Sequence, residues 1–417
     1  MKDEEFMQYY QHQLNNGLTI VGEHDADARS LAMGYFVRTG SRDETPEVNG
    51  VSHFLEHMMF KGTANRTPDD VNREFDEMGA RYNAFTSEEN TVYYGNVLPQ
   101  FQEKLQALLS DMMRPALREE DFNMEKNVIL EEIAMYWDRP QFRVFEQLRE
   151  SYYGDHPLGA SILGSAESIK NLSAAQMQKY FSQRYAANNL TLVLTGNFDW
   201  DKACADAEKW CTNWNTDDVP RQLPEHQAIA KEERLADDKT NRAHIALMAP
   251  GFSAQDPRRI AAEVAAEVIG AGDGSHLYWA LVHPGIAEAA QIGHDANDGD
   301  GAFYGYLLAD PARSAQALET FKKVIADACE NGLKEDEVER AKRRLATHVL
   351  LGSETPMGRM RPLGMDQVYR HEYRSAPDLL GQIESVSLSE MNELLAKSTF
   401  DAATVVILEP PTAHSPL

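Results

Sequence analysis

Two histidines and a glutamate lie within five positions in the segment "HFLEH", residues 53–57. On a helix, His53 and His57 would occupy one face, because they are four residues apart, and Glu56 would lie beside them. A catalytic zinc ion takes three protein ligands and keeps one position open. The histidines could supply two of these ligands, and Glu56 could take a proton from water, in the order of an inverzincin motif. An ordinary amphipathic helix with surface or core histidines would give the same pattern, so a third ligand must be found.

The helix-forming segment "NMEKNVILEEIAMYWD" offers three glutamates downstream. Glu125 and Glu132 are seven residues apart and share a face, with apolar residues between them. Carboxylates on a partly buried face are costly unless they are paired or bind metal. We therefore predict Glu132 as the third ligand and Glu125 as a support that orients a ligand side chain. Glu131 should point about 100° away into solvent; alternatively, Glu131 and Glu132 both belong to an exposed acidic face.

The length of the chain predicts two domains. Its 417 residues exceed one ordinary hydrophobic core and suit two domains of about 200 residues each. Residues 215–240 are polar, contain proline and lack sustained periodicity, which is typical of a linker. The sequence therefore predicts a metal-binding catalytic domain at 1–214, a linker at 215–240 and a second domain at 241–417.

The two halves resemble each other weakly. Residues 117–133 and 333–349 align at an offset of 216, and both run on as charged amphipathic helices. Apolar runs that predict strands alternate with helices of 12 or more residues; the clearest are residues 18–24, 31–40, 91–98, 190–196 and 244–250. We expect two homologous α+β domains with antiparallel-rich sheets packed against helices. The second copy should lack a metal site, because Ala341 and His348 replace Glu125 and Glu132.

Composition excludes several classes of function. The formal charge of −26, from 40 basic and 66 acidic residues, argues against nucleic acid as a partner. No apolar run approaches the roughly 18 residues of a membrane span. The acidic, polar N-terminal segment does not read as a secretory signal, so a cytoplasmic location is expected. The three cysteines lack metal-binding spacing, so a metal would need histidine and carboxylate ligands.

Three segments together resemble the pitrilysin-type inverzincin zinc metallopeptidases, in the branch of mitochondrial processing peptidase and its bacterial relatives: "HFLEHMMFKGT", "YNAFTSEENTVYY" and "MEKNVILEEI". The resemblance covers nearly the whole chain and implies a duplicated processing-peptidase or LuxS-like metallohydrolase fold. It also implies one Zn2+ per chain on His53, His57 and Glu132, with Glu56 as the general base and Glu125 as a second acid of the site. The expected activity is zinc-dependent endopeptidase cleavage of extended peptides or small unfolded proteins.

Two other functions fit the same resemblance. The first is a non-catalytic assembly or scaffold subunit of a processing-peptidase-like complex, although a scaffold has no need of a complete set of ligands and base. The second is zinc chemistry on a small molecule. Zinc content separates the scaffold from the other two, and a peptide-cleavage screen separates those two from each other.

The resemblance further implies that Asn83–Ser87, "NAFTS", forms an edge strand of the active-site sheet. A peptide substrate would add to Asn83, Ala84, Phe85 and Thr86 as a further strand, so that recognition would mostly read its backbone. Phe85 would either line a side pocket or serve as a core aromatic residue.

One feature of the family is missing. Members or their partner subunits carry an Arg and a Tyr seven residues apart in the C-terminal half, which serve the oxyanion. The Arg position falls at Leu281 or Val282 and the Tyr position at Glu288 or Ala289. Either a related subunit supplies both residues in a heterodimer, or other groups serve the oxyanion. A dimer is expected in both cases, because two domains make half of the closed chamber that the family uses.

Overall fold

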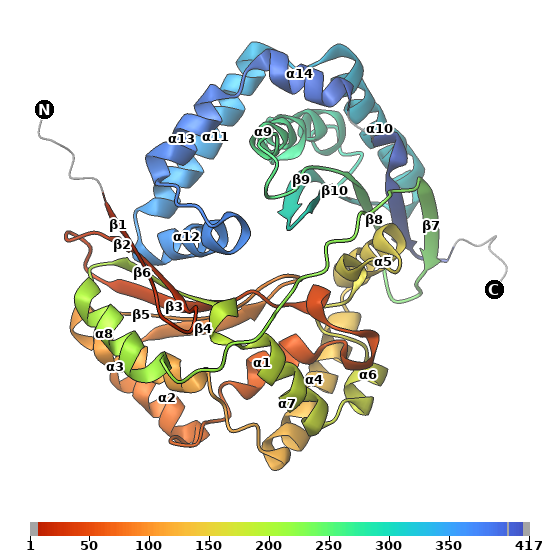
Figure 1. Cartoon of the computed structure of the whole chain (residues 1–417). Helices are drawn as coiled ribbons and strands as arrows, with labels where there is room; N and C mark the ends of the chain where they lie inside the picture. Colours follow the sequence, from red (N-terminus) through yellow and green to blue (C-terminus); the bar gives the residue numbers. More distant parts are fainter. Residues whose placement is uncertain (1–6, 398–399, 412–417) are drawn as a thin grey trace, which may run out of the picture. The chain divides into compact units, whose positions relative to one another are not determined.

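The computed structural model describes residues 7–397 and 400–411, which form two α+β units (Figure 1). Unit 1 contains the described residues up to Ile133, together with Ala160–Gln222 and Leu350–Ser375. Unit 2 contains Ala134–Gly159, Leu223–Val349 and the described residues from Ala376 onward. Within the described ranges, no helix combines the length and the apolar character needed to cross a bilayer.

Unit 1 is built on a six-stranded sheet in the order β1-β2-β6-β3-β5-β4. Strands β2 and β6 are parallel, and the other neighbours are antiparallel. The four strands predicted in the first half are confirmed as β2, β3, β5 and β6. The bounds are Gln8–Gln13 for β1, Thr19–His24 for β2, Leu31–Val37 for β3, Arg81–Thr86 for β4, Thr91–Val97 for β5 and Leu190–Gly196 for β6.

Helices cover both faces of this sheet. Helix α12 packs on β3 and β6 from one side, and α1 and α3 contact the β4–β5 and β3–β5 strands (Figure 1). The buried α12 side chains Met360 and Leu363 join Phe36 and Val92 in one apolar cluster. The helices are α1 (Val51–Met58), α2 (Pro68–Glu77), α3 (Gln102–Met112), α4 (Glu119–Trp137), α6 (Ala166–Asn171), α7 (Ala174–Arg184), α8 (Trp200–Cys211) and α12 (Pro356–Arg370).

Unit 2 has a five-stranded sheet in the order β7-β11-β8-β10-β9, with β7 and β11 parallel. Its strands are β7 (Lys231–Ala236), β8 (Ala243–Pro250), β9 (Ala289–Asn297), β10 (Asp300–Ala309) and β11 (Thr404–Glu409). Strand β8 confirms the prediction at 244–250. The helices are α5 (Pro140–Tyr153), α9 (Arg259–Gly270), α10 (Ser314–Asn331), α11 (Glu335–Ser353), α13 (Ala376–Ser385) and α14 (Leu388–Ala396).

The internal duplication is confirmed. Five strands of each sheet follow the same order, and in each the parallel pair lies at the corresponding place. Both bounds of α11 lie 216 residues after those of α4, and α12 begins 216 residues after α5. The two copies exchange one helix each: α5, from the first half, packs on β8 and β11 of unit 2, and α12, from the second half, packs on the sheet of unit 1.

The expected linker at 215–240 contains a strand. Residues 231–236 form β7, which pairs with β11 and so belongs to the second sheet. The expected domains at 1–214 and 241–417 therefore separate the strands of the two sheets, apart from β7. They do not separate the helices that cover those sheets, because α5 and α12 are exchanged.

Candidate metal centre

Helix α1 carries the "HFLEH" segment, and its first turn is held by a carboxylate. Glu44 accepts hydrogen bonds from the backbone N–H groups of Gly50 and Ser52, both at 2.7 Å, and from the side chain of Asn49 at 3.1 Å. A carboxylate at this end satisfies orphan donors and interacts favourably with the helix dipole. Gly50 has φ +91°, and an added Cβ would lie 2.7 Å from the carbonyl oxygen of Leu163. This turn therefore requires glycine.

The side chains of His53, His57 and Glu132 converge. One donor atom from each can be chosen so that all three lie within 4.8 Å of one another. Glu132 Oε2 lies 3.7 Å from His53 Nε2 and 3.5 Å from His57 Nε2. In the part of the chain that the structure describes, this is the one group of three or more His, Cys, Asp or Glu side chains arranged in this way.

Helix α4 is aligned with α1 by aromatic stacking. The rings of Phe54 on α1 and Phe122 on α4 are stacked with their centroids 4.7 Å apart. Phe122 and Ile129 are buried, whereas Glu131 is exposed. This orientation turns Glu132 toward the histidines and Glu131 into solvent.

Glu125 supports His57 from behind. Its Oε1 lies 2.9 Å from His57 Nδ1, and its Oε2 lies 2.6 Å from Lys61 Nζ. When Nδ1 donates its hydrogen to a carboxylate, the Nε2 lone pair is free to face a metal. Burial alone would raise the pKa of Glu125, but the hydrogen bonds from His57 and Lys61 outweigh it and lower that pKa. Glu125 is therefore ionised, and Lys61 is a member of this group that the sequence did not predict.

The two histidines differ electrostatically. Burial, and secondarily the charge of His57, lowers the pKa of His53 to about 3, so that His53 is neutral near pH 7. Burial also opposes the charged form of His57, but the hydrogen bond to Glu125 and the charges of the nearby carboxylates raise the pKa of His57. Both imidazoles thus lie beside the carboxylate of Glu132. The carboxylate of Glu125 contacts His57 and can offset the positive charge of a bound cation.

Glu56 is held by a residue of the neighbouring strand. Thr86 at the end of β4 donates its hydroxyl hydrogen to Glu56 Oε2 at 2.6 Å. Burial raises the pKa of Glu56, and the hydrogen bond from Thr86 only partly opposes this. A raised pKa favours proton uptake by the carboxylate. The sequence predicted Thr86 for its backbone alone and missed its hydroxyl.

Residues Asn83, Ala84, Phe85 and Thr86 lie in β4, the last strand of the six-stranded sheet. Its neighbour is β5, and the opposite edge has no strand among the described residues. Phe85 is partly buried against the apolar cluster beneath α12, and the guanidinium carbon of Arg361 lies 5.2 Å from its ring centroid. Phe85 is therefore partly buried, and both of its expected roles, in a side pocket or in the core, remain predictions.

The residues at the positions of the missing Arg and Tyr have structural contacts within unit 2. Leu281 is fully buried in the core of unit 2, and Val282 packs against that core. Glu288 pairs with Arg242 at 2.5 Å, and Ala289 begins β9. These four residues offer neither a cation nor a phenol to a ligand.

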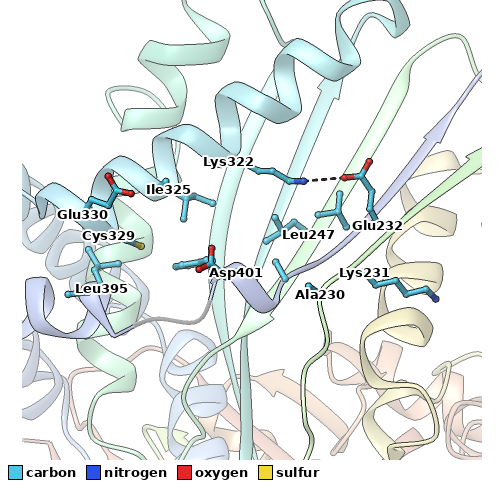
Figure 2. Close-up of a pocket in the computed structure, with 15 residues that line it drawn as sticks. Ala230, Lys231, Glu232, Leu247, Lys322, Ile325, Cys329, Glu330, Leu395 and Asp401 are labelled. Atoms are coloured by element: carbon cyan, nitrogen blue, oxygen red, sulfur yellow. Dashed lines mark hydrogen bonds and ion pairs between the residues drawn. The ribbon is translucent and has the colours of Figure 1, made fainter.

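A pocket of unit 2 lies away from these residues. Figure 2 shows it in unit 2, where Lys322 of α10 pairs with Glu232 of β7 at 3.2 Å. Its volume is about 740 Å³, and Leu247 and Ile325 form part of its apolar lining. None of the predicted metal ligands or Glu56 lines it.

The donor set fits zinc. Two imidazoles and a carboxylate are the ligands of many catalytic zinc sites, with bonds of about 2.0–2.2 Å and the fourth position left open. Such bonds in tetrahedral geometry separate ligand atoms by about 3.3–3.6 Å. The observed 3.5 and 3.7 Å are close to this spacing and too long for strong hydrogen bonds. The carboxylate oxygen of Glu132 therefore lies from each imidazole nitrogen at about the distance that separates two ligands of one metal ion.

Comparison with known sequences finds one peptidase family and relatives that cover nearly the whole chain. A model of the insulinase family, peptidase family M16, matches residues 19–166, and one described as the peptidase M16 inactive domain matches residues 171–345. An uncharacterized zinc protease of Bacillus subtilis, YmxG, is 30% identical over 403 residues, covering 96% of this chain and 98% of that protein. The mitochondrial-processing peptidase subunit beta of Neurospora crassa is 29% identical over 410 residues, covering 93% and 85%.

Solved structures share the fold. A protease from Helicobacter pylori superposes with a TM-score of 0.91 at 19% identity, covering 97% of this chain and all of that one. A structure described as a peptidase M16 inactive domain, from Pseudomonas fluorescens, gives a TM-score of 0.89 at 20% identity, covering 99% and 100%. At these identities the likeness concerns the arrangement of helices and strands.

Proposed function

The chain belongs to peptidase family M16, the insulinase family, and on this premise we propose that it is a zinc-dependent endopeptidase acting on extended peptides or small unfolded proteins. The observation that carries the proposal is the convergence of His53, His57 and Glu132 beside Glu56. These residues are contributed by two helices that are far apart in sequence. In this proposal His53, His57 and Glu132 hold one Zn2+ per chain.

The chain's own residues would divide the chemistry as follows. Zinc, when bound, supplies Lewis acidity that lowers the pKa of water and polarises a carbonyl. Glu56 accepts the proton of the attacking water and returns it to the leaving amine. Thr86 fixes the Glu56 carboxylate, and Glu125 fixes the ring of His57. Lys61 keeps Glu125 ionised, so that the hydrogen on His57 stays at Nδ1.

The substrate would bind as a strand. The free edge of β4 can pair with an extended backbone, which gives affinity with little dependence on sequence. Because Thr86 belongs to this strand and contacts Glu56, a peptide paired with β4 would run directly past the general base. A folded protein has few backbone segments that are free to pair in this way, which favours peptides and unfolded proteins as substrates.

Stabilisation of the oxyanion calls for a partner. Zinc and the four residues of the centre leave the developing charge short of donors, and Leu281 and Glu288 cannot provide them. We propose a dimer, in which a related subunit supplies the Arg and the Tyr. One relative is named as a subunit beta, which supports a paired arrangement.

Metal removal tests the proposal. The purified chain is incubated with a mixture of fluorogenic peptides, alone and with the product of a neighbouring related gene, before and after chelation. We expect cleavage that stops on chelation and returns with stoichiometric Zn2+. Zinc bound with no cleavage of any peptide in either mixture would favour the scaffold role or chemistry on a small molecule. If the protein binds no zinc, the scaffold role is the only one of the three functions that remains.

Replacing Thr86 tests how the base is held. We expect Thr86→Val to lower kcat by about 10-fold, as loss of a hydrogen bond to a charged group of about 1.5 kcal/mol implies. Thr86→Ser should recover most of this loss, because the hydroxyl is retained. Zinc content and KM should stay close to those of the unaltered protein in both variants. Equal kcat for Val and Ser variants would contradict this role of the hydroxyl.

A further inference from the structure

Arg361 of α12 is an unpaired cation beside the edge strand. Its guanidinium carbon lies 5.2 Å from the centroid of the Phe85 ring, and the residue is exposed. No ion pair of Arg361 is found within residues 7–397 and 400–411. The chain as a whole is acidic, with 66 acidic and 40 basic residues, so a positively charged side chain beside β4 stands out from the net charge of the chain. Its charge is therefore available to a ligand.

The two faces of β4 have different neighbours. Thr86 points to α1, since it contacts Glu56, whereas Phe85 points to α12, since it lies beneath Arg361. Successive side chains of a strand alternate between faces. The carboxylate of Glu56 and the guanidinium of Arg361 therefore lie on opposite faces of β4.

A second cation shares the face of Arg361. Arg81 begins β4 four residues before Phe85, so that Arg81, Asn83 and Phe85 point to the same side. Arg81 is exposed, and it too makes no ion pair within the described part of the chain. The face of β4 toward α12 thus carries positive charge near both of its ends.

A peptide paired with β4 would meet these cations. Side chains directly opposite one another on neighbouring strands have their Cβ atoms about 4.5–5.5 Å apart. Every second residue of the peptide would point to the face of Arg361, and arginine is the side chain that matches a carboxylate with two parallel hydrogen bonds. A lysine at the same place would be repelled.

We propose that Arg361, seated over Phe85, is a specificity-determining residue that selects an acidic side chain of the peptide substrate, with Arg81 favouring a second acidic residue about four positions away. This inference rests on the proposed peptidase function and names its substrate class as acidic extended peptides. Phe85 is then part of a side-chain subsite and not only a core aromatic residue.

The test uses labelled peptides that carry a single Glu, Gln or Lys at each position in turn of an otherwise uncharged parent. Binding is measured by fluorescence anisotropy with zinc-loaded Glu56→Gln protein, so that it does not depend on turnover. At one position we expect Glu to bind about fivefold more tightly than Gln, the scale of an exposed ion pair. Arg361→Gln should abolish this preference, and Arg361→Glu should reverse it in favour of Lys.

Arg29 provides the matched control. It is an exposed arginine between β2 and β3, separated from β4 in the sheet by β3 and β5, and Arg29→Gln makes the same change in net charge. The Glu preference should survive in Arg29→Gln, and all variants should keep the melting temperature of their parent. A Glu preference absent from the parent, or unchanged in Arg361→Gln, would overturn the proposal. Zinc-dependent cleavage of the uncharged peptide by the unaltered chain is read separately and reports on the peptidase function.

Discussion

Glu56→Gln should retain zinc and lose peptide hydrolysis by about 10³-fold to 10⁴-fold, the upper part of the range for a general base. The amide has the shape of the carboxylate, and its oxygen can still accept the hydrogen bond from Thr86. It cannot, however, take up a proton from water. The measurement is kcat/KM on a fluorogenic peptide, together with zinc content by atomic absorption.

Glu131→Gln is the control for this substitution. Glu131 is exposed on the same helix as Glu132, and its replacement removes one negative charge without touching the centre. Activity of this variant should stay within about twofold of the unaltered protein, in line with the small effects of exposed charges. A Glu56→Gln protein that cleaves at the unaltered rate would remove Glu56 from the mechanism.

Glu132→Ala should lose zinc. With two histidines left, the affinity should fall by more than about 100-fold, the most that loss of a supporting outer residue usually costs. His57→Ala should have an effect of the same size, because it also removes a ligand. Titration against a zinc-chelating dye measures both affinities.

Two other glutamates on the same helix provide comparison values for the loss of zinc affinity. Glu125→Gln keeps an acceptor for His57 Nδ1 but removes the charge, so the affinity should fall by about 10-fold to 100-fold. Glu131→Ala should leave the affinity unchanged, because its side chain points away from the histidines. Undiminished zinc in Glu132→Ala would place the third ligand elsewhere, and loss of zinc in Glu131→Ala would identify it.

Much of the fold followed from local patterns. Four strands are short apolar runs, at residues 19–24, 31–37, 91–97 and 190–196. Their apolar residues follow one another without alternation because both faces of the strands are largely buried. The duplication was visible because the charged helices α4 and α11 keep the same bounds at a constant offset. Spacing alone brought His53 and His57 together, since four residues make about one turn.

Other features depend on contacts that no local pattern encodes. Strand β7 is polar and exposed, because it forms one edge of its sheet, and it therefore resembled a linker. The exchange of α5 and α12 is decided by which sheet their apolar faces cover, and both sheets offer similar surfaces. Glu44, Lys61 and the hydroxyl of Thr86 contact the site through hydrogen bonds or ion pairs between separate segments. The spacing of residues in the sequence predicted where the site lies but not these contacts.

The late position of α12 in the chain affects how the protein is made. All strands of the first sheet have been synthesised by Gly196, yet the helix that covers Phe36 and Val92 begins at Pro356. At typical elongation rates the nascent sheet would wait about 10–30 seconds on the ribosome with that apolar surface bare. A chaperone is therefore expected to attend its biosynthesis, and a fragment ending in the linker should aggregate.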